Sequence, residues 1–193
     1  MLQRLATHSP RNFAALEDVE QVAAAPSLTG APSKDWIMSR TKRILGLIGW
    51  LLLCFAPAAL GTLFMPGEWY ATLEKPAWNP PGWIFGPVWS ALYTMMAVAA
   101  WLVWNRGGFA AQCRPLGWFL AQLILNAAWT PLFFGLHRPG LAFAEILLLW
   151  LAIGATIAAF WRVHRGAAWL LGPYWVWVSF ATLLNGTLWK LNP

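Results

Sequence analysis

Residues Pro139–Trp161 read PGLAFAEILLLWLAIGATIAAFW, an apolar run in which Glu145 is the one charged side chain. A helix of about 20 apolar residues is long enough to cross the hydrocarbon core of a bilayer. Only helices and closed barrels satisfy the backbone there, and this run lacks the alternation of a barrel strand. The sequence therefore predicts an all-α membrane protein, a five-transmembrane-helix bundle. The other four apolar runs are Ile44–Phe64, Trp83–Trp104, Pro115–Gly135 and Ala167–Trp189.

The composition agrees with a membrane protein and excludes several other classes. Of the 193 residues, 59% are hydrophobic and 10% are charged, whereas about a quarter of the residues of a soluble domain are charged. The sixteen tryptophans carry indole N–H groups that need partners or a water interface. The net charge of +6 lies in short clusters, without the basic stripe of a nucleic-acid-binding protein. Cys54 and Cys113 belong to no Cys/His cluster with metal-ligand spacing, so we expect no metal site.

The chain before the first apolar run has a different character. Residues 1–43 hold three prolines and four of the seven acidic residues, and they lack the apolar core of a signal peptide. We expect a mobile N-terminal tail over residues 1–43. Met38, which precedes a basic cluster and the first apolar run, is an alternative start of the protein. Residues 44–193 then form the five-helix transmembrane domain.

The basic residues near the ends of the runs predict the orientation of the bundle. Cytoplasmic loops of membrane proteins carry an excess of Lys and Arg. In a bacterial inner membrane this rule places the N-terminus in the cytoplasm and the loop at residues 65–82 outside. The end with more basic residues has Lys34, Arg40, Lys42, Arg43, Arg106, Arg114, Arg162 and Arg165, and the other end has Lys75, Arg138 and Lys190.

Polar and indole side chains collect in the outer half of the predicted bundle, beneath the loop at 65–82. A cavity capped by this loop explains the distribution. Because an ionised carboxylate is costly in hydrocarbon, Glu145 either faces the bundle interior, paired or protonated, or lies close enough to the interface to reach headgroup water. Asn126 and Asn185 also fit ordinary hydrogen bonds between helices. The side chains at this depth are Trp89, Asn126, Trp129, Glu145, Trp177, Thr182 and Asn185.

The loop at 65–82 has the sequence of a stiff aromatic lid. Its residues 68–83 read EWYATLEKPAWNPPGW, in which rigid prolines alternate with aromatic rings. Three further motifs follow it along the chain: Trp89-x-x-Leu92-Tyr93, Gln122-x-x-x-Asn126-x-x-Trp129-x-Pro131-x-Phe133-Phe134-Gly135 and Pro173-Tyr174-x-x-Trp177-x-x-Phe180-Ala181-Thr182-x-x-Asn185. With these motifs the loop resembles the TspO/translocator-protein family, the tryptophan-rich sensory proteins related to the peripheral benzodiazepine receptor.

The resemblance implies a function as well as a fold. It implies a tryptophan-rich sensory or translocator protein that binds porphyrins, protoporphyrin-type tetrapyrroles, and related flat apolar ligands in an indole-lined cavity under the first loop. Such a protein regulates tetrapyrrole metabolism or a stress response. The porphyrin is a ligand, so no cofactor is expected, and a homodimer is implied. The positions that match the family's ligand-binding residues are Trp69, Tyr70, Trp89, Asn126, Trp129, Trp177 and Ala181.

Two other functions remain open on the same resemblance. One is an enzyme that degrades porphyrin with light and oxygen, in which Trp89 and Trp177 are the catalytic indoles. The other is a porphyrin or sterol transporter. Gly186 stands where animal members have the tyrosine of a sterol motif, which argues against sterol binding.

The remaining expectations concern partners and histidines. Besides membrane lipid, we expect a second copy of the chain, since Gly117-x-x-x-Ala121 offers a face of small residues for close helix packing. The histidines are His8, His137 and His164, none of them predicted opposite the cavity wall. Stacking on indoles is therefore favoured over ligation of a haem iron.

Overall fold

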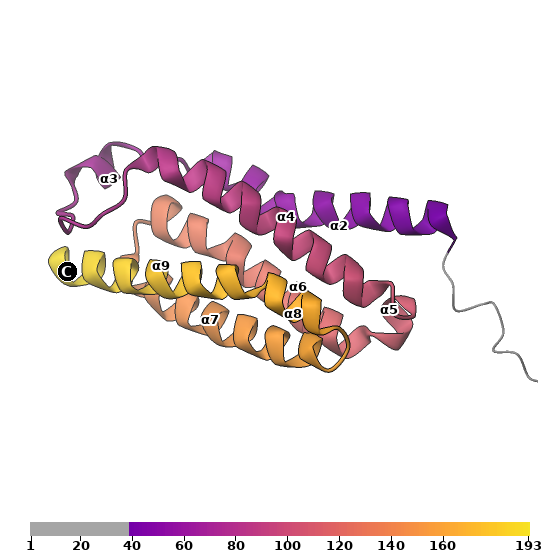
Figure 1. Ribbon diagram of the computed structural model, residues 1–193. Helices are drawn as coiled ribbons and strands as arrows, with labels where there is room; N and C mark the ends of the chain where they lie inside the picture. Colours follow the sequence, from indigo (N-terminus) through magenta and orange to yellow (C-terminus); the bar gives the residue numbers. More distant parts are fainter. Residues whose placement is uncertain (1–38) are drawn as a thin grey trace, which may run out of the picture. The chain divides into compact units, whose positions relative to one another are not determined.

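The computed structural model describes residues 39–193, and within them five long helices lie side by side (Figure 1). Each of the five is long and apolar enough to span a membrane. The predicted all-α, five-transmembrane-helix bundle is therefore confirmed. The predicted N-terminal tail falls on residues 1–38 for most of its length, which lie outside the described residues. The five helices are α2 (Arg40–Gly61), α4 (Phe85–Trp104), α6 (Cys113–Thr130), α7 (Pro139–Trp161) and α9 (Gly172–Leu191).

Short helical turns connect the long helices at both ends of the bundle. The loop between α2 and α4 contains the helix α3, which covers one end of the bundle, beside the C-terminus (Figure 1). Among the long helices, α7 packs between α6 and α9, and α2 packs against α4 and α6. The connecting turns are η3 (Thr62–Phe64), α3 (Glu68–Thr72), η4 (Gly82–Ile84), α5 (Gly108–Ala111), η5 (Pro131–Gly135) and α8 (Arg165–Leu170).

The first long helix begins at Arg40, four residues before the predicted Ile44 and inside the predicted tail. The Ser39 hydroxyl accepts a hydrogen bond of 3.3 Å from the backbone N–H of Lys42 and caps the helix. A cap of this kind satisfies one of the unpaired N–H groups of the first turn. The helix therefore includes one more turn, residues 40–43, before the apolar run. The position where the apolar residues begin does not by itself predict this additional turn.

The structure divides the predicted run Ala167–Trp189, which contains Pro173, between two helices. The chain forms the short helix α8, turns at Leu171 and starts α9 at Gly172, so Pro173 occupies the first turn of the new helix. Proline is well tolerated there because its missing N–H would have no partner in any case. Pro57, in contrast, lies inside α2 and is buried.

Helix α9 approaches α7 closely at Gly186. A Cβ atom at this position would lie 2.8 Å from Cε2 of Phe143 on α7. The site therefore has no room for a side chain unless the Phe143 ring moves. The tyrosine of a sterol motif would point into this contact, which gives the departure at Gly186 a structural reason.

This contact predicts that Gly186→Ala destabilises the bundle. Overpacking a well-packed contact costs about 1–3 kcal/mol. Gly117→Ala is the matched control, because nothing lies within 4 Å of a Cβ at Gly117 in the second turn of α6. We expect the free energy of unfolding in detergent to be about 1–3 kcal/mol lower for Gly186→Ala than for Gly117→Ala. Equal stabilities would show that Phe143 gives way without cost.

Candidate functional site: an aromatic surface below the first loop

The first loop is fastened to the end of α9 by one asparagine. The backbone N–H of Glu74 donates to Oδ1 of Asn192 at 2.9 Å, and Nδ2 of Asn192 donates to the carbonyl of Glu74 at 3.0 Å. Nδ2 of Asn192 also lies 2.9 Å from the carbonyl of Leu188, within its own helix. These bonds hold the loop against the C-terminal end of α9.

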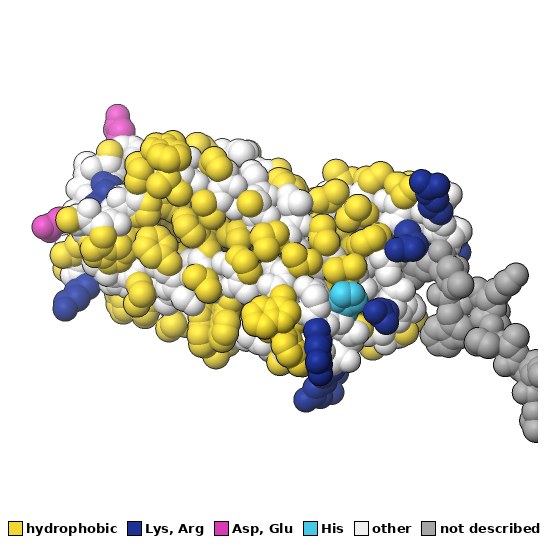
Figure 2. Space-filling view, viewed as in Figure 1, with side chains coloured by type: hydrophobic (Ala, Val, Ile, Leu, Met, Phe, Trp, Pro, Cys, Tyr) yellow, Lys and Arg dark blue, Asp and Glu magenta, His cyan; other side chains and the backbone are white. Residues whose placement is uncertain are grey.

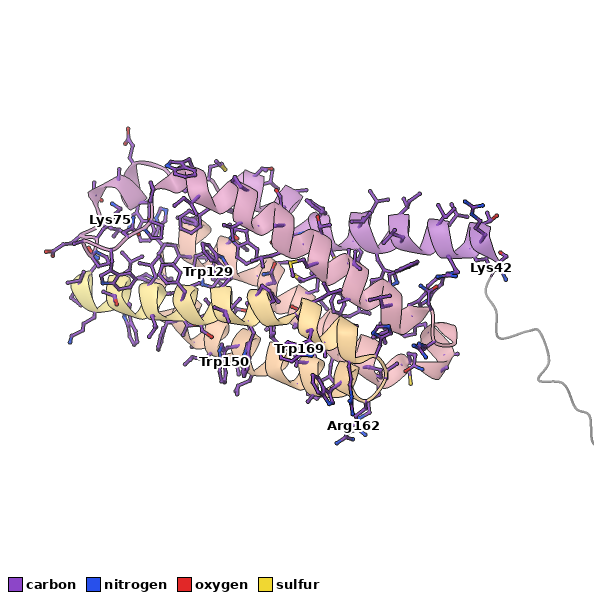
Figure 3. All side chains as sticks on the ribbon, viewed as in Figure 1. Lys42, Lys75, Trp129, Trp150, Arg162 and Trp169 are labelled. Carbon is purple, nitrogen blue, oxygen red and sulfur yellow. The ribbon has the colours of Figure 1, made fainter. Side chains whose placement is uncertain are left out.

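The Tyr70 side chain, on the lid helix α3, makes a hydrogen bond and a contact with an ammonium group. Its hydroxyl donates to Oδ1 of Asn79 at 3.5 Å, and the ammonium group of Lys75 lies 4.8 Å from the centre of its ring. Burial raises the pKa of the Tyr70 phenol above its ordinary value, and the hydrogen bond to Asn79 opposes this shift. The phenol therefore stays neutral at physiological pH. Figure 3 shows Lys75 at this end of the bundle.

Predicted residues Trp69, Tyr70 and Trp129 meet in one aromatic cluster below the loop. Phe133, in the turn η5 that continues α6, is its centre and is 1% exposed. The ring of Phe133 stacks on Trp129 with centroids 4.9 Å apart, and Trp69 contacts it edge-on at 5.7 Å. Tyr70 contacts Phe134 at 5.4 Å. The loop thus packs its two predicted residues onto the C-terminal end of α6.

A second row of rings runs from the lid along α9. Trp78 of the loop contacts Phe180 at 5.9 Å, and Phe180 contacts Trp177 at 5.6 Å. Trp177 in turn contacts Phe85 at the start of α4 at 5.9 Å. Predicted residue Trp177 is therefore connected to the lid through Trp78 and Phe180. Ala181, the next residue of α9, is partly buried and packs against the main core.

Trp89 covers a chain of buried hydrogen bonds between helices. Its indole stacks on Tyr93 with centroids 5.2 Å apart. The Tyr93 hydroxyl donates to Oδ1 of Asn126 at 2.9 Å, and Nδ2 of Asn126 donates to the Tyr174 hydroxyl at 3.1 Å. The Tyr174 hydroxyl donates to Oε1 of Gln122 at 3.0 Å. Asn126 therefore links α4, α6 and α9, which is the interhelical role that the sequence left open for it.

Asn185 has a comparable structural role. Its Oδ1 accepts a hydrogen bond from the indole N–H of Trp129 at 3.0 Å, and its Nδ2 donates to the carbonyl of Pro139 at 2.8 Å. These bonds fix the orientation of the Trp129 ring, which lies inside the bundle (Figure 3). One face of the indole is thereby held against Phe133.

Glu145 faces the interior of the bundle. It is 8% exposed, and neither carboxylate oxygen has a hydrogen-bond partner among the described residues. Nε2 of Gln122 is also buried and without a partner. Of the positions considered for Glu145, the structure shows the one inside the bundle, without a pairing partner among the described residues.

Two hollows of the described surface each contain one of the seven predicted residues. A groove of about 700 Å³ between α4 and α9 includes Trp177. A depression of about 500 Å³ at the lid end includes Trp69. Asn126 is buried, while the other predicted residues are partly buried. The structure therefore brings Trp69, Tyr70 and Trp129 together and connects Trp177 to the loop through ring contacts. Trp89 and Asn126 lie instead at the buried hydrogen bonds around Tyr93, and neither hollow contains more than one of the seven residues.

Four ring-bearing residues of this region were missed by the sequence reasoning. His137 was not expected near the cavity, yet its ring stacks on Trp69 with centroids 4.3 Å apart. His137 has a φ of 54°, in the left-handed region that few side chains adopt, and no sequence pattern signals this turn. Trp78, Phe180 and Phe133 lay in quoted motifs, so their spacing relative to Trp69, Trp177 and Trp129 was an available signal.

The tie between Asn192 and Glu74 predicts that Asn192→Ala loosens the lid. The substitution removes both hydrogen bonds to the Glu74 backbone. We expect hydrogen exchange at the Glu74 amide to accelerate about tenfold, the effect of losing a bond of about 1–1.5 kcal/mol. The control is Thr187→Ala, which removes a hydrogen bond within α9 only. Unchanged exchange at Glu74 in Asn192→Ala would contradict the tie.

Comparisons with known proteins agree on one family. The model of the TspO/MBR family matches residues 50–190. The chain is 45% identical over 138 residues to the translocator protein of Homo sapiens, covering 69% of this chain and 82% of the relative. It is 41% identical over 158 residues to the tryptophan-rich sensory protein of Cereibacter sphaeroides, covering 82% and 93%. It is 43% identical over 156 residues to the tryptophan-rich protein TspO of Chlorobaculum tepidum, covering 79% and 99%.

Proposed function

Because the chain belongs to the TspO/MBR family, we propose that it binds a porphyrin of the protoporphyrin type on the aromatic surface below the first loop. The observation that carries the proposal is the pair of ring rows that each reach the first loop. One row joins Trp69 to Trp129 through Phe133, and the other joins Trp78 to Trp177 through Phe180. Flat aromatic ligands stack well on such rings, which have apolar faces and few polar atoms.

The polar partners of these rings support the same proposal. The indole N–H of Trp129 is already bonded to Asn185, and the hydroxyl of Tyr93 is bonded to Asn126. A ligand that lies on these rings therefore meets apolar faces whose polar atoms are already satisfied. This chemistry favours a large apolar macrocycle over a small polar substrate.

A titration with protoporphyrin tests the proposal. Added to the purified protein in detergent, protoporphyrin should quench indole fluorescence with a saturating curve. Unfolded protein at the same tryptophan concentration serves as the control for optical and collisional effects. Quenching that rises without saturation and equals that of the unfolded protein would contradict a binding site.

We further propose that the bound porphyrin makes the protein a sensor in tetrapyrrole metabolism or in a stress response. The protein's membrane location and its lid suit reversible occupancy by an apolar ligand. A deletion strain that is complemented with the native chain should recover its porphyrin content under stress, whereas a variant that does not bind porphyrin should fail to restore it. Full recovery with the non-binding variant would overturn the sensing role.

For the orientation, we propose that the end of the bundle with Arg106, Arg114 and Arg162 faces the cytoplasm of a bacterial cell. Cys113 lies at this end and is exposed, whereas Cys54 is buried. The native chain therefore offers one accessible thiol as a reporter. A membrane-impermeant maleimide should label Cys113 only after the cells are opened. Labelling of intact cells would reverse the orientation.

We also propose that the protein is a homodimer through the outer face of α6. Gly117 and Ala121 are exposed on that face, beside Trp118 and Ile124. Small residues allow two helices to approach closely in a membrane. Gly117→Leu should lower the yield of cross-linked dimer, while Gly49→Leu on α2, also without neighbours within 4 Å, should not. Equal yields would reject this interface.

A further inference from the structure

The groove between α4 and α9 has apolar walls along its length. Val88 and Leu92 of α4 form one wall, and Trp177 and Phe180 of α9 form the other. Trp169 of α8 and Pro173 line the end next to α8. The groove has a volume of about 700 Å³ and no polar side chain among its lining residues. Since α4 and α9 both span the membrane, the groove opens onto the hydrocarbon region and matches an acyl chain.

An arginine cluster lies at the α8 end of this groove. Trp169 is 70% exposed, and its ring contacts Trp161 edge-on with centroids 5.9 Å apart. The guanidinium carbon of Arg165 lies 5.7 Å from the centre of the Trp161 ring. Arg162 follows Trp161 directly in the chain. Figure 3 shows Trp169 and Arg162 at this same end. Indoles of this kind prefer the level of the lipid headgroups.

The charge at this end is uncompensated within the described part of the chain. The acidic residues of the described part are Glu68 and Glu74, both in the first loop, and the buried Glu145, so none of them lies beside the arginines. In Figure 2 the basic side chains near α8 adjoin a hydrophobic patch, while the acidic ones lie at the opposite end. Exposed arginines beside interfacial indoles are suited to hold a phosphate group.

From this arrangement we propose that the groove is a binding site for an anionic phospholipid, with one acyl chain between α4 and α9 and the phosphate on Arg162 and Arg165. The aromatic pair Trp161 and Trp169 lies beside the glycerol region. The site is separate from the proposed porphyrin surface except at Trp177 and Phe180, so the variants that test it leave both residues unchanged.

Native mass spectrometry of the purified protein tests this site. The protein is released from vesicles of equimolar phosphatidylglycerol and phosphatidylcholine, and retained lipids are identified by mass. We expect one phosphatidylglycerol to be retained in preference to phosphatidylcholine. In the variant Arg162→Gln/Arg165→Gln this preference should fall about tenfold or more, because the variant lacks both arginines that attract the anionic headgroup. Trp169→Ala should reduce retention of both lipids.

The matched control is Arg40→Gln/Arg114→Gln, which removes two basic residues from the same end of the bundle but away from the groove. It should retain phosphatidylglycerol like the native chain. An equal loss in this control would overturn the site in favour of a general charge effect. Displacement of the lipid by inorganic phosphate would also overturn the site. It would show that the arginines bind the phosphate group alone and that the groove contributes nothing to lipid retention. A shift from dimer to monomer in Trp169→Ala, with lipid retention unchanged, would assign the groove to a second copy of the chain instead.

Discussion

Replacing Trp89 and Trp177 together with alanine should weaken protoporphyrin binding about thirtyfold. Each indole contributes stacking of about 0.5–1.5 kcal/mol in addition to the apolar area that it buries. Trp177 belongs to the ring row that reaches the loop through Phe180, and Trp89 offers a partly buried indole that stacks on Tyr93. The dissociation constant is measured by quenching of the remaining indoles.

A double variant of the same size on the outer surface is the control. Trp118→Ala/Trp161→Ala removes two indoles that are 44% and 43% exposed and lie outside the aromatic surface. It should bind protoporphyrin with the native affinity. Circular dichroism and the unfolding temperature establish that both double variants fold. Undiminished affinity in the Trp89/Trp177 variant, with the fold intact, would exclude these two rings from the site.

The second large effect is expected for Asn126→Leu, which should lower the free energy of unfolding by about 1–3 kcal/mol. Asn126 accepts a hydrogen bond from Tyr93 and donates one to Tyr174, and both tyrosines are buried. Single hydrogen bonds between membrane helices contribute about 0.6 kcal/mol on average. The larger loss arises because the Tyr93 hydroxyl is left buried without an acceptor.

The variant Tyr93→Phe separates these two contributions. It removes one hydrogen bond and leaves Oδ1 of Asn126 without a donor, but the bond from Asn126 to Tyr174, which Asn126→Leu also removes, stays in place. We expect its loss to be about 0.6 kcal/mol, clearly smaller than that of Asn126→Leu. Both are measured by unfolding in mixed detergent micelles. If Asn126→Leu is as stable as the native chain, the chain of hydrogen bonds does not hold the three helices together.

The sequence was sufficient for the five helices because membrane crossing is decided by length and hydropathy. Residues Pro139–Trp161 were predicted as one segment and form α7 with the same bounds. The predicted start of the last segment was wrong because an average of hydropathy along the chain does not reveal a turn between two helices. There the His164 ring accepts the backbone N–H of Ala167 at 3.1 Å and caps α8, and Pro173 then begins α9.

The sequence was sufficient to propose which residues belong to the candidate site. It predicted only part of how these residues are arranged in space. Trp69, Tyr70 and Trp129 do come together, since the lid must return to the end of the bundle from which it leaves. The contact of His137 with Trp69 depends on a backbone turn with positive φ. Likewise, the connection of Trp177 to the lid through Phe180 depends on side-chain orientations that residue spacing does not define.

The central claim, that a porphyrin lies on the aromatic surface below the first loop, is tested most directly by mapping photo-oxidation in the complex. Under light and air a bound porphyrin generates singlet oxygen, which oxidises the indoles nearest to it. Trp118 and Trp161, which are exposed and outside the proposed site, serve as reporters for oxidation elsewhere on the bundle. Mass spectrometry of peptides from a briefly illuminated complex should find oxidation first at Trp69, Trp89, Trp129 and Trp177, with Trp118 and Trp161 unmodified. Oxidation that begins at Trp118 or Trp161, or that proceeds equally at all six, would contradict the site.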